Sequence, residues 1–261
     1  MPDQVSLYAP GNSGLHHLHP LTKLSLAGFA LLAGLTLPGR WGTYLLVALF
    51  LLPLAAWGGL AGRLGNAVWR IVLPFAVSVF VIQGLFWTGG TPVLQLGPLS
   101  VKAEGISFAI ASSGRILTVV TAFLLLILST RPDALMIALT ERGLPPTITY
   151  IVLATIQIVP RFQARAQTIM DAQQSRGLRL EGSLIQRGRA LIPLVVPLVL
   201  GSIVDVEQRA MALEARGFSR PGPKTSYLQL VDSQWQSILR AALIVLSVLA
   251  VVGRLALLII P

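Results

Sequence analysis

Two short segments of the chain, forty residues apart, place an arginine before a glycine at the end of an amphipathic pattern. Each has a small residue, an arginine and a glycine in this order, namely Ser175, Arg176 and Gly177 in the first and Ala215, Arg216 and Gly217 in the second. A bulky apolar residue follows each glycine. Apolar residues recur at three- and four-residue spacing before each arginine, which predicts helices over about 161–176 and 203–216.

Two interpretations of these arginines are open at this point. Glycine often ends a helix in a left-handed turn, and arginine in the last turn offsets the exposed carbonyls, so both segments fit ordinary helix ends. Arg142 and Gly143 form a third ending of this kind, which favours that interpretation. Arginine is also the preferred residue for buried ion pairs at interfaces. Two arginines on two similar helix tips would therefore suit two similar partner proteins.

The chain offers little that could do catalytic chemistry. His16, His17 and His19 lie close together, but zinc sites need three or four converging ligands, and the sequence has no further histidine and no cysteine. We therefore expect an interfacial segment there rather than a metal site. A phosphate-binding loop ending in Lys-Ser or Lys-Thr is also missing. We expect a chain that is not an enzyme and that binds no metal, ATP or other cofactor.

Composition points to a membrane protein. Hydrophobic residues make up 54% of the 261 residues and charged residues only 11%, whereas soluble domains carry about 25% charged residues. The net charge of +10 could suggest nucleic-acid binding. The basic residues lie between apolar runs, however, where the orientation rule for membrane proteins places them. We therefore expect a lipid bilayer and no nucleic acid as the partner of this charge.

The apolar runs predict about five membrane-spanning helices. They cover about 22–38, 43–60, 69–87, 106–129 and 238–260. Lys23, Arg63, Arg70 and Arg131 flank one side of these runs, whereas Arg40 and Lys102 flank the other, which predicts a cytosolic N-terminus and an external C-terminus. Residues 1–14 lack a basic segment followed by an apolar core, so we expect no signal peptide.

The stretch from 131 to 237 differs from the rest because it holds most of the charged residues. Its two apolar runs, 144–160 and 190–204, are short and contain prolines, and we expect helices that lie under or partly in the membrane. The predicted fold is all-α: a polytopic membrane helical bundle with a cytosolic helical coupling region. Its predicted parts are N-terminal membrane helices over 1–130, the coupling region over 131–237 and a last membrane helix over 238–261.

Groups of residues along nearly the whole chain resemble one family. They are 8–13 (YAPGNS) and 15–23 (LHHLHPLTK), 143–145 (GLP), 159–162 (VPRF), 191–198 (LIPLVVPL) and the two Arg-Gly endings. Their order and spacing are similar to those of the transmembrane (T) component of energy-coupling factor transporters, the family of the cobalt- and biotin-transport membrane subunits. Two positions depart from the family pattern. His19 stands where the family usually has aspartate, and Ser175 stands where it usually has alanine.

The resemblance implies a coupling subunit in the membrane of a prokaryotic cell, such as the inner membrane, in an ATP-driven importer of a vitamin or a metal ion. Two cytosolic ATPase subunits, which bind ATP and Mg, would engage the two Arg-Gly helices, and a small substrate-binding membrane protein, the S component, would pack against the helical bundle. Arg176 and Arg216 would anchor the ATPases, with Gly177 and Gly217 ending the helices beside Ser175 and Ala215. The substrate would be selected by the S component.

Three other classes of protein stay open. A membrane enzyme would need a catalytic group, and the three histidines are the only candidates. A secondary transporter would place ionisable groups inside the membrane, and Arg115 lies well within an expected span while Glu104 lies near its outer edge. A conventional permease of an ATP-driven importer would have a single coupling loop, and the paired endings disfavour it.

The predicted orientation can be tested by labelling single cysteines, because the sequence has none. Cysteines introduced as Arg179→Cys or Lys224→Cys should resist an impermeant thiol reagent in sealed cells and react once the membrane is opened. An Arg40→Cys variant, on the side we expect to face outward, is the matched control and should react in sealed cells. Reaction of position 179 or 224 from outside would contradict the predicted cytosolic region.

Overall fold

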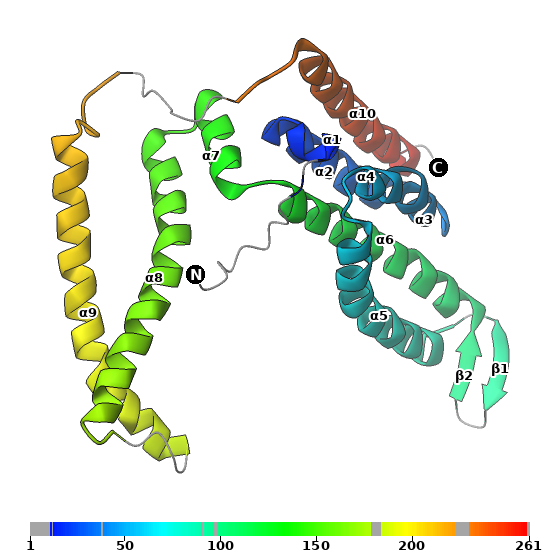
Figure 1. Ribbon diagram of the computed structural model, residues 1–261. Helices are drawn as coiled ribbons and strands as arrows, with labels where there is room; N and C mark the ends of the chain where they lie inside the picture. The colour runs from blue at the N-terminus through cyan, green and yellow to red at the C-terminus, as the bar shows by residue number, and fades with distance from the viewer. Residues whose placement is uncertain are drawn as a thin grey trace. The chain divides into compact units, whose positions relative to one another are not determined.

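The computed structural model describes residues 11, 13–37, 39–89, 91–96, 99–178, 184–222 and 230–259 (Figure 1). The chain divides into two units, one made of residues 6–142 with 228–261 and the other of residues 143–227 with 1–5. Most of the opening motif at 8–13 and the labelling positions Arg179 and Lys224 lie outside the described residues.

The first unit is almost entirely helical. In chain order it contains α1 (Gly14–His17), α2 (Pro20–Thr36), α3 (Gly42–Leu46), the π-helical turn η1 (Val47–Leu51), α4 (Leu52–Trp57), α5 (Ala61–Phe86), β1 (Pro92–Leu96), β2 (Leu99–Lys102), α6 (Ala103–Ser129), α7 (Pro132–Glu141) and α10 (Gln234–Ile259). The two strands pair antiparallel, with Leu96 opposite Leu99, and join α5 to α6 as a hairpin. This order confirms the predicted all-α membrane fold.

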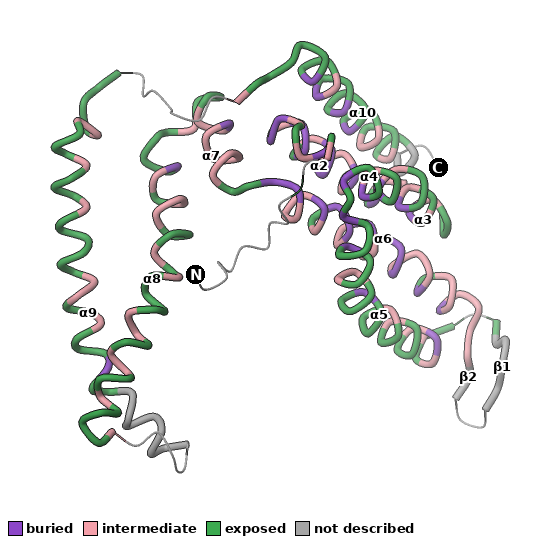
Figure 2. Tube along the Cα trace, viewed as in Figure 1, coloured by how far each residue is buried: buried purple, intermediate pink, exposed green. Residues whose placement is uncertain are grey.

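Three helices of this unit are long and apolar enough to cross a bilayer, namely α5, α6 and α10 up to Ala256. The first two expected spans correspond to shorter apolar helices, Pro20–Thr36 and Gly42–Trp57. Much of α5 and α10 is exposed (Figure 2), and the exposed residues include large apolar ones such as Phe75, Phe86 and Ile244. Such outward apolar surfaces fit contact with lipid. The number of spans stays a prediction.

Small residues let the helices of this unit approach closely. Gly34 of α2 lies against Thr118 of α6, and a side chain at Gly105 would collide with the carbonyl oxygen of Gln83 in α5. Close approach of this kind is how helices pack inside membranes, where burial of apolar surface gives little driving force. The buried core around Ala30 brings α2 together with α6 and with the consecutive elements α3, η1 and α4.

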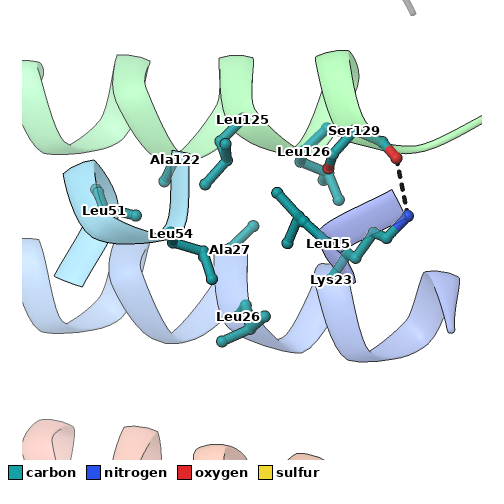
Figure 3. A pocket seen from close by; sticks show the side chains of 10 residues that line it. All are labelled: Leu15, Lys23, Leu26, Ala27, Leu51, Leu54, Ala122, Leu125, Leu126 and Ser129. Carbon is teal, nitrogen blue, oxygen red and sulfur yellow. Dashed lines mark hydrogen bonds between the residues drawn. The ribbon is translucent and has the colours of Figure 1, made fainter. Parts of the chain in front are cut away.

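Lys23 is buried in this unit, although the sequence suggested only a flanking charge. This residue is 6% exposed, and its Nζ donates a hydrogen bond to the carbonyl oxygen of Ser129 at 2.8 Å (Figure 3). A second hydrogen bond from Nζ goes to the carbonyl oxygen of His16 at 3.0 Å. The neighbouring cavity measures about 10 Å³, which is room for about one water molecule. We therefore assign Lys23 a structural role: it ties α1 and α2 to the end of α6.

The second unit consists of two long helices, α8 (Pro146–Ser175) and α9 (Leu184–Ala215). We predicted separate helices beginning near 161 and 203, and this boundary is wrong because each helix also includes the preceding apolar run. Pro160 lies inside α8, and Pro193 and Pro197 lie inside α9. Each proline removes one intrahelical hydrogen bond, and the uninterrupted bonds on both sides keep the helix continuous. Both helices are long, but among the residues that the structure describes neither contains a stretch that is apolar enough and poor enough in charge to count as a membrane span.

A buried polar cluster joins α2 to α10. His19, which is 3% exposed, caps α2 by accepting a hydrogen bond from the backbone N–H of Leu21 on Nδ1. The backbone N–H of His19 donates a hydrogen bond to Oε1 of Gln236 at 2.7 Å. Arg240 places Nη1 at 3.4 Å from the same Nδ1 and Nη2 at 2.6 Å from Oδ2 of Asp232.

Asp232 supplies the carboxylate of this cluster. Arg240 is 7% exposed, and a buried guanidinium needs a counter-charge. The resemblance leads one to expect an aspartate at position 19, where this chain has a histidine. Here the partner of Arg240 comes from position 232, just before α10. The hydrogen bond from Arg240 holds the pKa of Asp232 below its ordinary value.

The burial of His19 makes stability depend on pH. Burial is the main cause that lowers the pKa of His19, whereas the unfolded chain protonates this histidine near pH 6.5. Since the unfolded state then binds more protons, stability should be complete above about pH 6.5 and should fall as the pH drops below it. The apparent Tm of the purified protein should therefore decrease between pH 7.5 and pH 5.5.

A His19→Asn variant should show a smaller decrease over the same pH range. Asparagine still caps a helix but does not titrate. His16 and His17 are present in both proteins, so their contributions cancel in the comparison. Equal pH dependence of the two proteins would show that His19 is not the responsible group.

Candidate functional site

The backbone at the end of α8 closes in a Schellman motif around Gly177. This glycine has φ = +93°, in the left-handed region that other residues avoid. Its N–H donates to the carbonyl of Gln174 at 2.9 Å, and the N–H of Leu178 donates to that of Gln173 at 3.0 Å. These two bonds satisfy carbonyls that the last helical turn would otherwise leave without partners.

The end of α9 repeats this geometry. Gly217 has φ = +71°, its N–H donates to the carbonyl of Glu214 at 2.8 Å, and the N–H of Phe218 donates to that of Leu213 at 3.0 Å. Both glycines therefore act as helix-ending residues, as one of the two interpretations of the sequence required. Because the backbone bonds complete the cap, the arginine side chains are not needed for it.

Arg176 and Arg216 are both exposed. Neither guanidinium forms an ion pair or a hydrogen bond with any residue that the structure describes. The neighbouring small residues, Ser175 and Ala215, are exposed as well, and the Ser175 hydroxyl donates back to the carbonyl of Asp171 at 3.0 Å. Each helix tip thus presents a cation beside small side chains, which leaves room for an acidic group of another molecule.

Arg142 differs from these two arginines. Gly143 also has a positive φ, +102°, so the predicted helix ending is present there. The Arg142 guanidinium, however, lies 3.7 Å from the carboxylate of Asp232. The third Arg-Gly segment therefore contributes to the polar cluster at α10, and its arginine already has an acidic neighbour.

Helices α8 and α9 pack against each other in antiparallel fashion. The ring of Tyr150, near the start of α8, contacts the ring of Phe218, just after α9, with centroids 5.4 Å apart. Further along α8, Arg165 forms an ion pair with Asp205 at 2.5 Å. The C-terminal ends of α8 and α9 therefore lie at opposite ends of the pair (Figure 1), which separates Arg176 from Arg216 by roughly 33 Å at 1.5 Å of helix per residue.

The two helices are equivalent about the Arg165–Asp205 pair. These residues are forty positions apart, as are Arg176 and Arg216, so the contact joins corresponding positions of the repeat. Each tip arginine lies eleven residues beyond it, about 16 Å along its helix. The pair is half-exposed and contributes little to stability, but it sets the register. The forty-residue repeat was visible in the sequence, whereas this contact across it was not.

The described residues contain no group of three histidine, aspartate or glutamate side chains placed to hold a metal ion. His16 bonds to Ser13, with 2.6 Å between Nδ1 and Oγ, and His19 belongs to the cluster at α10. The structure thus assigns local contacts to two of the three histidines. The arrangement as a whole defines an α-helical membrane protein that carries a separate pair of helices with two exposed arginine tips.

Comparison with known proteins identifies the family within this class. The profile of the cobalt transport protein (CbiQ) family matches residues 11–227. Energy-coupling factor transporter transmembrane protein EcfT of Leuconostoc gelidum is 31% identical over 252 residues, covering 92% of each chain. The EcfT protein of Limosilactobacillus fermentum is 30% identical over 268 residues, covering 96% of this chain and 97% of the relative. The chain belongs to this family of energy-coupling factor transporter transmembrane components.

The two glycines should be intolerant of a side chain. Gly177→Ala or Gly217→Ala forces alanine into the left-handed region at a cost of roughly 1–2 kcal/mol. The last turn of the affected helix should therefore fray, and amide hydrogen exchange at 173–178 or 213–218 should become faster. Gly28→Ala is the matched control, because Gly28 is helical and has open space around it. Unchanged exchange in both tip variants would exclude the proposed cap.

Proposed function

We propose that this chain is the coupling subunit of an ATP-driven energy-coupling factor importer. In this proposal two cytosolic ABC ATPase subunits bind the ends of α8 and α9, and a membrane S component binds the substrate. Closure of the ATPases on ATP moves the two helices, and the movement is passed to the S component. The observation that carries the proposal is the pair of exposed arginines at equivalent, opposite ends of two packed helices.

The chemistry of the tips supports a protein partner. The backbone at each tip is already satisfied by its glycine, so Arg176 and Arg216 stay available for contacts outside the chain. A guanidinium presents a planar fork of donors that matches a carboxylate. Because both tips have the same cap, the same spacing from Arg165–Asp205 and small neighbours, they suit two copies of one docking groove or two similar grooves.

The proposal assigns chemistry to the partners and movement to this chain. ATP and Mg bind to the ATPases, and this chain is neither an enzyme nor a binder of a cofactor or metal. It lies in the cell membrane with a cytosolic N-terminus, and residues 131–237, which include the tips, face the cytosol. The S component selects the substrate, a vitamin or a metal ion.

Loss of both tip arginines should separate this chain from its ATPases. Truncating one side of a buried charge pair costs about 2–5 kcal/mol, and each 1.4 kcal/mol is tenfold in affinity. Arg176→Ala or Arg216→Ala alone should weaken one contact by roughly thirtyfold or more, while the second tip still holds the ATPase pair nearby. Uptake should fall in each single variant. The double variant should lose both ATPase pull-down and uptake, with unchanged membrane insertion.

Arg63→Ala is the appropriate control for these variants. Arg63 is exposed near the start of α5, in the other unit of the chain. Arg142 is unsuitable as a control because of its contact with Asp232. Full assembly and uptake in the double variant would show that neither arginine is needed to bind the ATPases, and equal damage from Arg63→Ala would point to a general effect of lost charge.

A further inference from the structure

A cavity of about 200 Å³ lies between α8 and α9, beside the Arg165–Asp205 ion pair. Arg161 and Arg165 line it from α8, and Asp205 and Arg209 line it from α9. The cavity adjoins the VPRF motif at 159–162, to which the function proposed for the tip arginines gives no role. It lies about 16 Å along the helix from either tip, so it is a site of its own.

The polar lining of this cavity has an excess of positive charge. Three arginines and one aspartate line it, and Arg165 already pairs with that aspartate. Arg161 and Arg209 have no ion pair with any described residue. Like charges around one cavity repel each other, and an anion placed between them would accept charge-assisted hydrogen bonds from both. The charge therefore favours an anionic ligand, and the planar donors of a guanidinium group match the geometry of a phosphate.

The rest of the lining is apolar. Ile158, Phe162 and Val206 border the cavity. Residues next to the lining in sequence are also apolar and exposed, with Val159 on α8 50% exposed and Ile203 on α9 58% exposed. A free inorganic anion gains nothing from an apolar wall. A ligand with a charged headgroup and apolar chains can contact both the arginines and the apolar side chains.

We propose that this cavity binds the phosphate group of an anionic phospholipid, with Arg161 and Arg209 as its ligands and Arg165 held in place by Asp205. The apolar run of α8 that leads up to Arg161 gives the helix an apolar surface next to a basic one. Helices of this composition lie at the membrane surface and attract anionic headgroups. The bound lipid would hold the middle of the helix pair at the headgroup layer while both tips stay free.

The test compares lipid retention by the purified full-length chain and its variants. The protein is reconstituted in vesicles of equal parts phosphatidylcholine and phosphatidylglycerol, extracted in mild detergent and examined by native mass spectrometry. The unaltered chain should retain phosphatidylglycerol in preference to phosphatidylcholine. In the Arg161→Gln, Arg209→Gln double variant that preference should fall by about tenfold or more, because both charge-assisted hydrogen bonds to the phosphate are lost.

An Arg63→Gln variant is the control and should keep the preference, and circular dichroism should show equal helix content in all three proteins. An unchanged preference in the double variant would overturn the proposal. A second arm adds inorganic phosphate to the extracted chain. If phosphate alone binds and displaces the lipid, the site takes a free anion and not a lipid. If the double variant keeps its lipid but loses ATPase pull-down, the arginines serve a protein contact instead.

Discussion

The ion pair between Asp232 and Arg240 is the contact on which the organisation of the first unit depends. Arg240 is buried and bonded to the residues that begin α2, and Asp232 is its acidic partner. The same carboxylate lies near Arg142, the last residue before the second unit, while residue 232 follows that unit closely in the chain. The two points at which the chain leaves and re-enters the first unit are thus tied to one carboxylate. Loss of Asp232 would leave a buried cation unpaired, and such changes are strongly destabilising.

The sequence predicted the features that depend on neighbouring residues, namely the apolar helices and the helix-ending glycines. The apolar runs at 69–87 and 106–129 fall within or very close to α5 and α6, and the glycines at 177 and 217 end helices because their left-handed turns depend on neighbouring residues only. Contacts between distant residues escaped prediction. Nothing near Lys23 in the sequence indicates that the carbonyl of Ser129 will accept a hydrogen bond from its Nζ. Likewise, the contact of Arg240 with His19 follows from the packing of α10 on α2, which no motif records. The continuity of α8 through Pro160 was missed because one lost hydrogen bond weighs little in a helix of 30 residues.

The helix ends show that the two interpretations of the Arg-Gly segments are compatible. Glycine satisfies the backbone, which relieves the preceding arginine of any part in the cap. An exposed guanidinium on a backbone fixed by two hydrogen bonds loses little main-chain freedom when it docks, and preorganisation of this kind favours affinity. The cap therefore prepares the arginine for a contact that the chain itself does not provide.

The opposite charges of Arg165 and Asp205 also favour one pairing of these helices over the others. In an antiparallel pair of equivalent helices, corresponding positions face each other near the axis. Two copies of α8 would bring Arg165 against Arg165, and two copies of α9 would bring Asp205 against Asp205; both encounters are repulsive. Only the mixed pair is attractive, so the charges discriminate against self-association of either helix between neighbouring molecules in a crowded membrane. A contact that adds little to stability can thus still disfavour pairing of α8 or α9 with the same helix of a neighbouring molecule.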